Sequence, residues 1–257
     1  MSQAVPNIAR MYDYYLGGLE SRPVDREAAE RVLAAAPQVR VAVRENRGFL
    51  ERAVTYLAGR GIVQFLDVGS GLPTQRNVHQ ILREVSPGAR VVYVDYDPEV
   101  VRRSQELLQD VRTAVYVQGD VRDLPRVCAD PWVRAVIDFE RPVGVLLLAV
   151  LNFVGDQDDP AGIMRGLRAL VASGSLLAFS HGARREEDKA TAAGVQRAYR
   201  GTSGQAVLRT RAELARLLEG CQLVPPGLVY ATQWTADADA PLADTGTAMT
   251  LAAVGRL

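Results

Sequence analysis

The sequence has few of the residues on which several common chemistries depend. Lys189 is the only lysine among 30 basic residues. A Schiff-base or phosphate-loop mechanism would therefore rest on that one side chain, and we discount both. The two cysteines, Cys128 and Cys221, are far apart and form no C-x-x-C pair. This spacing indicates neither a disulfide framework nor a metal site, so we expect no bound metal.

The sequence also lacks an excess of charge and a long apolar run. Its 257 residues include 30 basic and 30 acidic side chains, so the chain has no net positive charge that would attract nucleic acid. The longest apolar run, 143–154, is shorter than the roughly 20 residues that span a bilayer. The N-terminus shows no basic region followed by an apolar stretch, as a signal peptide would. We therefore expect a cytoplasmic protein that binds neither nucleic acid nor membrane.

What the sequence does contain is an alternation of strand and helix patterns after a helical beginning. Residues 1–62 have apolar positions at helical spacing, and we expect them to form a cap or lid segment. Residues 63–257 then predict a doubly wound, mostly parallel, seven-stranded α/β sheet, which is a Rossmann-like binding domain. The last two strands, 228–234 and 247–255, are expected to form a closing hairpin. The other expected strands are 63–68, 90–95, 114–118, 143–149 and 175–180, and expected helices with clear caps are 98–109, 160–172 and 210–219.

A glycine turn follows the first expected strand. Residues 65–73 read Phe-Leu-Asp-Val-Gly-Ser-Gly-Leu-Pro, and Pro73 suits the first turn of a helix. A strand that passes through such a turn into a helix exposes backbone N–H groups to a cofactor. The third glycine of the dinucleotide pattern G-x-G-x-x-G is replaced by Thr74. The turn therefore indicates a nucleoside cofactor but argues against a standard NAD site.

Acidic residues follow the next two expected strands. Asp95 ends the second strand, where a carboxylate can accept both hydrogen bonds of a ribose diol. Asp120 follows the third strand and could accept a bond from an adenine amino group. With Asp67 and the glycine turn, these residues fall on the carboxyl edge of the sheet, where ligands of open parallel sheets bind. Each acid alone could be only a cap or turn residue, but together they indicate an adenosine-type ligand.

These motifs resemble those of class I S-adenosylmethionine-dependent methyltransferases. The stretches that carry the resemblance are 65–71, 93–98 and 119–120. Further motifs resemble the actinobacterial "S-adenosyl methyltransferase" family, once a domain of unknown function, and the resemblance covers nearly the whole chain. Those motifs read Ala-Arg-Met-Tyr-Asp-Tyr-Tyr-Leu-Gly-Gly at 9–18, Arg-Glu-Asn-Arg at 44–47, Gly-Leu-Pro-Thr at 71–74 and Val-Leu-Leu-Leu-Ala-Val-Leu-Asn-Phe-Val at 145–154.

The resemblance implies which residues would bind S-adenosyl-L-methionine. Gly69, Ser70 and Gly71 would face its methionine part, and Asp95 would face the ribose. The remaining cofactor-binding residues are expected to be Asp67, Tyr96, Asp120 and Val121. The tyrosine-rich segment 12–15 could fold over the cofactor with Arg10 or Tyr12 near its carboxylate, or could simply pack on the sheet.

No residue is identified as catalytic. The acceptor-side candidates are Asn152 and His181, which follow the fourth and fifth expected strands. The family often has histidine where this chain has Asn152. Either side chain could instead only tie down a loop.

Three functions are consistent with these features. The first is an S-adenosylmethionine-dependent methyltransferase that acts on a small molecule. The second is a sensor or accessory protein that binds the same cofactor without transferring a methyl group, since no base is obvious. The third is an NAD-dependent oxidoreductase, which would share the use of Asp95 but lacks the third glycine.

Overall fold

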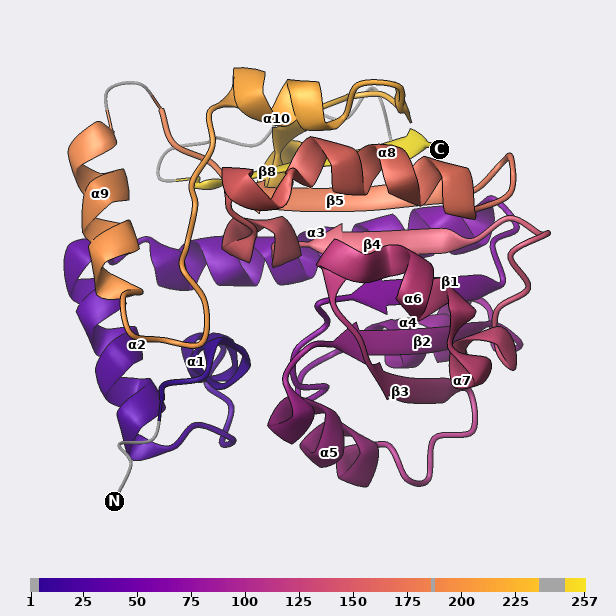
Figure 1. Ribbon diagram of the computed structural model, residues 1–257, viewed down its shortest axis with the longest axis horizontal. Helices are drawn as coiled ribbons and strands as arrows, with labels where there is room; N and C mark the ends of the chain where they lie inside the picture. Colours follow the sequence, from indigo (N-terminus) through magenta and orange to yellow (C-terminus); the bar gives the residue numbers. More distant parts are fainter. Residues whose placement is uncertain (1–4, 186–187, 236–247) are drawn as a thin grey trace.

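The centre of the molecule is a mostly parallel sheet (Figure 1). The computed structural model describes residues 5–185, 188–235 and 248–257. Within them the strand order is β3-β2-β1-β4-β5-β8-β6, and β7 also pairs with β8. Strands β1 to β5 run parallel, whereas β8 is antiparallel to β5, β6 and β7. The strands are β1 (Gln64–Val68), β2 (Arg90–Asp95), β3 (Ala114–Gln118), β4 (Gly144–Leu148), β5 (Leu176–Gly182), β6 (Gln222–Leu223), β7 (Val229–Tyr230) and β8 (Thr250–Arg256).

The expected α/β fold is confirmed, with one strand more than the seven predicted. The addition is β6, whose two residues are too few to show an alternating pattern in the sequence. The closing antiparallel pair is present, although β7 is only Val229–Tyr230. Most of the connecting loop, together with Thr247 of the expected last strand, lies outside the described residues.

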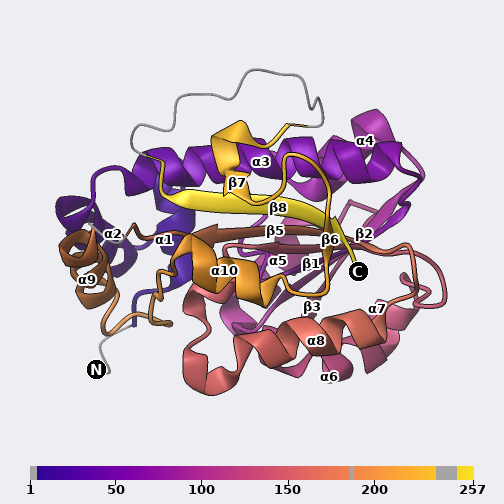
Figure 2. The ribbon, with the colours of Figure 1, turned by 90° about the horizontal axis from the view of Figure 1, so that it is seen from above.

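Helices cover both faces of the sheet (Figure 2). In β2, Val91 and Tyr93 pack on one face, while Val92 and Val94 pack on the other. This explains why the strands are apolar at every position, as is usual for a doubly covered parallel sheet. The first face carries α3 (Val39–Gly59), α4 (Val78–Val85) and α5 (Pro98–Leu107), and the second carries α6 (Leu124–Ala129), α7 (Pro131–Arg134), α8 (Pro160–Leu170) and α10 (Arg211–Leu217).

A third helical group lies beyond the carboxyl ends of the strands (Figure 1). It comprises α1 (Ile8–Tyr15), α2 (Pro23–Ala35) and α9 (Lys189–Ala198), packed around Met11, Val32 and Val195. The division into a cap of 1–62 and a binding domain of 63–257 stays a prediction. Helix α3 contacts β5 and β8, so only α1 and α2 of the proposed cap lie apart from the sheet.

A buried ion pair fixes α1 against α2. The Asp25 side chain is fully buried and accepts a hydrogen bond from Arg10 Nε at 2.7 Å. It also accepts from the N–H groups of Asn7, at 2.7 Å, and Arg22, at 2.9 Å. Arg10 reaches Glu99 of α5 as well, at 3.0 Å. The Asp25 carboxylate therefore holds α1 against the start of α2, and Arg10 links this segment to α5.

Replacing Arg10 with methionine is expected to lower the free energy of unfolding by about 3–5 kcal/mol, because Asp25 would remain as an unpaired buried charge. Urea denaturation measures the change. The matched control is Arg22→Met, which removes an exposed guanidinium paired with Glu99 and should cost less than about 1 kcal/mol. Equal losses in both variants would contradict a dominant role for the buried pair.

Candidate functional site

The carboxyl ends of β1, β2 and β3 open onto one cavity of about 390 Å³. Helices α1 and α3, the segment after β4 and the loop around Ser203 complete its wall. The structure brings together here the eight residues that were expected to bind the cofactor, together with Tyr12 but without Arg10. These residues are Asp67, Gly69, Ser70, Gly71, Asp95, Tyr96, Asp120 and Val121.

The glycine turn after β1 is bound tightly to the end of β2. Gly69 and Gly71 have φ angles of +72° and +63°, which L side chains rarely adopt. A Cβ atom on Gly69 would also lie 2.1 Å from a methyl carbon of Val150. The N–H groups of Gly69 and Ser70 donate to Val94 O at 2.8 and 3.1 Å. Gly71 N donates to the Asp95 carboxylate at 3.1 Å.

The expectation of bare N–H groups at a helix N-terminus is therefore wrong. The three N–H groups of the turn are used by β2. The helix that follows begins only at Val78, and Pro73 lies in the connecting segment. At the start of this helix, Gln80 Oε1 accepts from Asn77 N at 2.7 Å and Tyr93 Oη accepts from His79 N at 2.9 Å, so these two N–H groups already have partners.

Asp67 and Arg47 lie beside this turn, and neither side chain has all of its hydrogen-bonding groups paired. Asp67 is 6% exposed and makes no hydrogen bond to a described residue. Burial raises the pKa of Asp67 to about 7, against the opposing effect of the Arg47 charge. Arg47 donates to Asn77 Oδ1 at 3.0 Å, but its Nε is buried without a partner. Both side chains line the cavity, so they can bind complementary charges of a ligand.

Asp95 and Asp120 differ in how free their oxygens are. Burial raises the pKa of Asp95 to about 6, and its oxygens accept only backbone N–H groups, from Gly71 and Asp97 at 3.1 Å each. Both oxygens of Asp120 instead accept from Arg122. Burial acts to raise the pKa of Asp120, but the Arg122 hydrogen bonds outweigh it and lower the pKa. Asp95 therefore has more capacity for a ligand.

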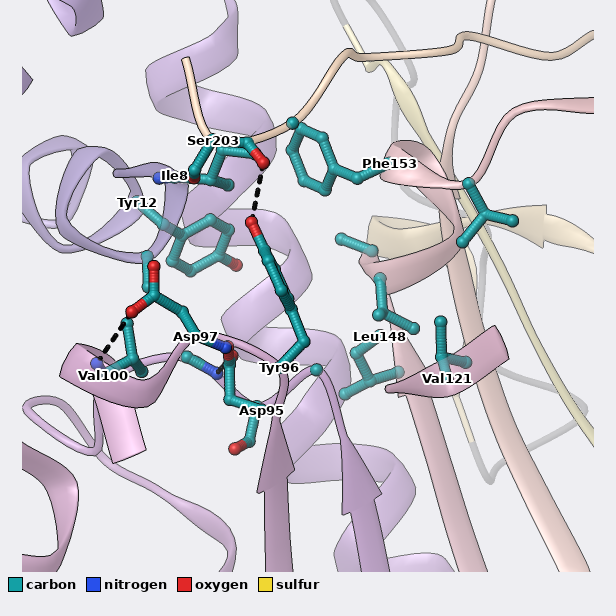
Figure 3. A pocket seen from close by; sticks show the side chains of 18 of the residues that line it. Ile8, Tyr12, Asp95, Tyr96, Asp97, Val100, Val121, Leu148, Phe153 and Ser203 are labelled. Atoms are coloured by element: carbon teal, nitrogen blue, oxygen red, sulfur yellow. Dashed lines mark hydrogen bonds between the residues drawn. The ribbon is translucent and has the colours of Figure 1, made fainter. Parts of the chain in front are cut away.

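Ser203 joins two walls of the cavity. Tyr96 Oη donates to Ser203 O at 2.7 Å, and Figure 3 shows this bond crossing the space beside Tyr12 and Phe153. Ser203 N donates to Pro6 O at 2.8 Å, and Ser203 Oγ accepts from Ile8 N at 3.0 Å. The N-terminal segment and the loop around Ser203 therefore form one continuous wall.

Two of the other predicted side chains are held away from this cavity. Arg10 is engaged by Asp25 and Glu99, so it is not placed to meet a ligand carboxylate. His181 is fully buried, and burial lowers its pKa to about 4. Its Nε2 lies 2.9 Å from Arg209, which can only donate, so Nδ1 carries the proton and donates to Gly182 O. This arrangement gives His181 a structural role.

Asn152 lies outside the main cavity but at the wall of an adjoining one. Its Oδ1 accepts from Gly182 N at 2.8 Å, which ties the segment after β4 to the end of β5. Asn46 and Arg47 also line the cavity but were not singled out from the sequence. They belong to the Arg44–Arg47 stretch, which carried a family resemblance but no assigned role.

Comparison with known proteins places this architecture among the Rossmann-like methyltransferases. Human N-acetylserotonin methyltransferase, solved in complex with S-adenosylmethionine, matches with a TM-score of 0.52 over 98% of this chain and 62% of that chain. At 15% identity, this likeness shows the fold alone. No match was found among the curated proteins.

The family model of the S-adenosyl methyltransferases matches residues 1–257, and the chain belongs to this family. It is 34% identical to a provisionally assigned methyltransferase from Thermobifida fusca YX, with a TM-score of 0.90 over 99% of this chain and 96% of that chain. It is 38% identical to a DUF574 family protein from Streptomyces avermitilis MA-4680, with a TM-score of 0.89 over 98% and 97% of the two chains.

None of the helices formed by the described residues has the length and apolar character needed to cross a membrane. In the same residues, no three His, Cys, Asp or Glu side chains are grouped so that they could hold a metal ion.

The raised pKa of Asp67 predicts how stability depends on pH. An aspartate in the unfolded chain ionises near pH 4, whereas Asp67 in the folded protein ionises at about 7. Between these values the folded state holds the extra proton, so this group makes the free energy of unfolding fall as pH rises. Asp67→Asn should therefore be more stable than the parent at pH 8 by about 2–4 kcal/mol, and by much less at pH 4.

Urea denaturation at pH 4, 6 and 8 checks this expectation. Asp110→Asn is the matched control, because Asp110 is exposed after α5 and should leave the pH dependence unchanged. The same pH dependence in Asp67→Asn and the parent would rule out the proposed cost of ionising Asp67.

Proposed function

We propose that the protein is an S-adenosyl-L-methionine-dependent methyltransferase whose acceptor is a small molecule. The observation that carries the proposal is the order of charged groups along one cavity. Asp120 lies just after β3, Asp95 is the last residue of β2, and Asp67 lies near the end of β1, with Arg47 beside it. Adenine, ribose and the amino-acid end of the cofactor would lie along these groups in the same order.

The residues fit the two ends of this cofactor. The amino-acid end carries an ammonium and a carboxylate, which Asp67 and Arg47 would pair, and Arg47 Nε is a buried donor that lacks a partner. Asp95 has free lone pairs for a ribose diol. Asp120 would approach adenine only while sharing its oxygens with Arg122, so the backbone at Val121 is the second candidate there.

The same geometry disfavours the NAD-dependent alternative. A dinucleotide presents a pyrophosphate, which such folds bind with free N–H groups at a helix N-terminus. Here the N–H groups of the glycine turn, and those of Asn77 and His79 at the start of α4, already have partners. The Asp67 and Asp95 carboxylates would also repel the negatively charged pyrophosphate of a dinucleotide.

When bound, the cofactor supplies an activated methyl group on a sulfonium, so the chain has mainly to align the acceptor and exclude water. The wall formed by Ser203, Tyr96 and the N-terminal segment encloses the space in which this alignment would occur. A cavity of about 390 Å³ is in the size range of small-ligand sites, which supports a small acceptor beside the cofactor. The balanced net charge of the chain gives no support for a nucleic-acid acceptor.

Calorimetry with S-adenosylmethionine, S-adenosylhomocysteine and NAD tests the cofactor. Binding of NAD with no binding of the other two would overturn the proposal. Transfer of label from methyl-labelled cofactor to a pool of small metabolites then separates an enzyme from a sensor that only binds.

Asp95→Ala is expected to weaken S-adenosylhomocysteine binding by about 1–3 kcal/mol, because the ribose hydroxyls would lose their acceptor inside a buried site. Calorimetry measures the change, and circular dichroism verifies folding. Asp110→Ala is the control, because that carboxylate is exposed and does not line the cavity. Unchanged affinity in a folded Asp95→Ala protein would contradict the ribose assignment.

Arg47→Met should weaken S-adenosylhomocysteine but leave adenosine binding nearly unchanged, because adenosine has no carboxylate for Arg47 to pair. Asp95→Ala should weaken both ligands, which makes the two variants internal controls for each other. The expected loss for Arg47→Met is about 1.5–3 kcal/mol, the range for hydrogen bonds to charged groups. An equal loss for adenosine would show that Arg47 does not contact the amino-acid end.

A further inference from the structure

A second cavity of about 90 Å³ adjoins the cofactor cavity, and we call it the tyrosine chamber. The two cavities share Ile8, Tyr12, Asn46, Ala149 and Phe153 as wall residues. Beyond this shared wall, the chamber extends to Tyr15 of α1 and Tyr199 at the end of α9. It therefore leads from the cofactor cavity into the interface between the N-terminal helices and the rest of the molecule.

The wall of the tyrosine chamber is apolar and aromatic. None of the described residues that line it carries a charged side chain. Phe153 and Tyr199 pack with their ring centroids 5.6 Å apart. An ion that entered this space would lose its hydration without gaining a partner of opposite charge, whereas a neutral ring would gain apolar contact.

One polar atom of the chamber lacks a partner. The Tyr15 side chain is 1% exposed, and its hydroxyl makes no hydrogen bond of normal geometry. Burial, and then the nearby Tyr199 hydroxyl, raise the pKa of Tyr15, so the group stays a neutral hydroxyl that can donate or accept. Buried hydroxyls are nearly always paired, and an unpaired one that lines a cavity points to a ligand group that completes it.

Two other polar side chains of the wall, Asn46 and Asn152, already have partners within the protein. Asn46 Nδ2 donates to Tyr12 Oη at 3.0 Å, and Asn46 Oδ1 accepts from Ser180 Oγ at 2.6 Å. Asn152 Oδ1 accepts from the Gly182 N–H, which leaves only the amide nitrogen of Asn152 as a donor. The Tyr15 hydroxyl is therefore the buried group without a partner that the chamber offers to a ligand.

We propose that the tyrosine chamber binds the methyl acceptor, and that this acceptor is a small neutral aromatic molecule with a hydrogen-bonding group that reaches Tyr15. This inference rests on the proposed function. A dry cavity that holds benzene has about 150 Å³, which exceeds the chamber. The chamber alone is therefore too small for the ring, so the acceptor would lie between the two cavities, beside the residues that they share.

The reaction balances without a base in the chamber wall. A lone pair on an oxygen or nitrogen of the acceptor forms the new bond to the methyl carbon as the carbon–sulfur bond breaks. The electron pair of that bond stays on sulfur, which becomes a neutral thioether. The acceptor gains the positive charge and releases its proton to water.

Phenol is the probe that tests the chamber, and it is offered to protein saturated with S-adenosylhomocysteine. Saturation-transfer NMR should detect phenol but not benzoate or benzylammonium at the same concentration. Tyr15→Phe should weaken phenol binding about 3- to 10-fold, the loss of one neutral hydrogen bond. The matched control is Tyr14→Phe, because the Tyr14 hydroxyl contacts Glu30 and does not line the chamber.

Filling the chamber provides a second variant. Ala42→Leu and Ala206→Leu each add a branched side chain to its wall, from α3 and from the loop after Ser203. Both should abolish the phenol signal while calorimetry shows unchanged S-adenosylhomocysteine binding, which also reports correct folding.

Each outcome decides a separate question. Failure of S-adenosylhomocysteine to bind the parent protein overturns the proposed function, and the acceptor role of the chamber with it. If S-adenosylhomocysteine binds, three results overturn the chamber alone: no phenol signal, phenol binding unaffected by both Tyr15→Phe and Ala42→Leu, or equal binding of the charged probes.

Discussion

The hydrogen bonds between the glycine turn and the end of β2 are the interaction on which the site depends. Gly69 and Ser70 direct their N–H groups to Val94 O, and Gly71 directs its N–H to Asp95. Only glycine adopts the positive φ angles of this turn without strain, and only glycine leaves room for Val150. Because these donors are used within the protein, the edge of the sheet presents carboxylates to the cavity instead of N–H groups.

The negative charges at that edge are only partly compensated by the protein itself. Asp67 is buried with Asp95 as a second carboxylate close enough to raise its pKa, and Arg47 compensates only in part. Groups fixed in this way need little reorganisation when charge arrives, since the fold has already met the cost of burying them. A ligand with its own ammonium and carboxylate would pair with Asp67 and Arg47, whereas an anionic pyrophosphate would be repelled by the carboxylates.

The fold and the acidic edge of the sheet were largely predictable, because both depend on short-range patterns. Strands such as 90–95 stand out by their apolar runs, and Asp97 caps the following helix as its position before Pro98 suggests. The partners of the glycine turn were not predictable, because Val94 O becomes available only when β1 and β2 pair. Likewise, the burial of Tyr15 was not predictable, because it depends on packing with Val195 of α9 and with Tyr199, which lie far along the chain.

The contacts of Ser203 also determine when the cavity can exist. Its hydroxyl accepts from Ile8 N across 195 positions of sequence, and its carbonyl accepts from Tyr96. Loop closure over such a separation is slow. The contacts of Ser203 can form only when both segments are present. A chain that is still being synthesised therefore has an incomplete wall until Val207 has emerged. Any ligand of the finished cavity consequently stabilises the segment around Ile8 and the loop around Ser203 together.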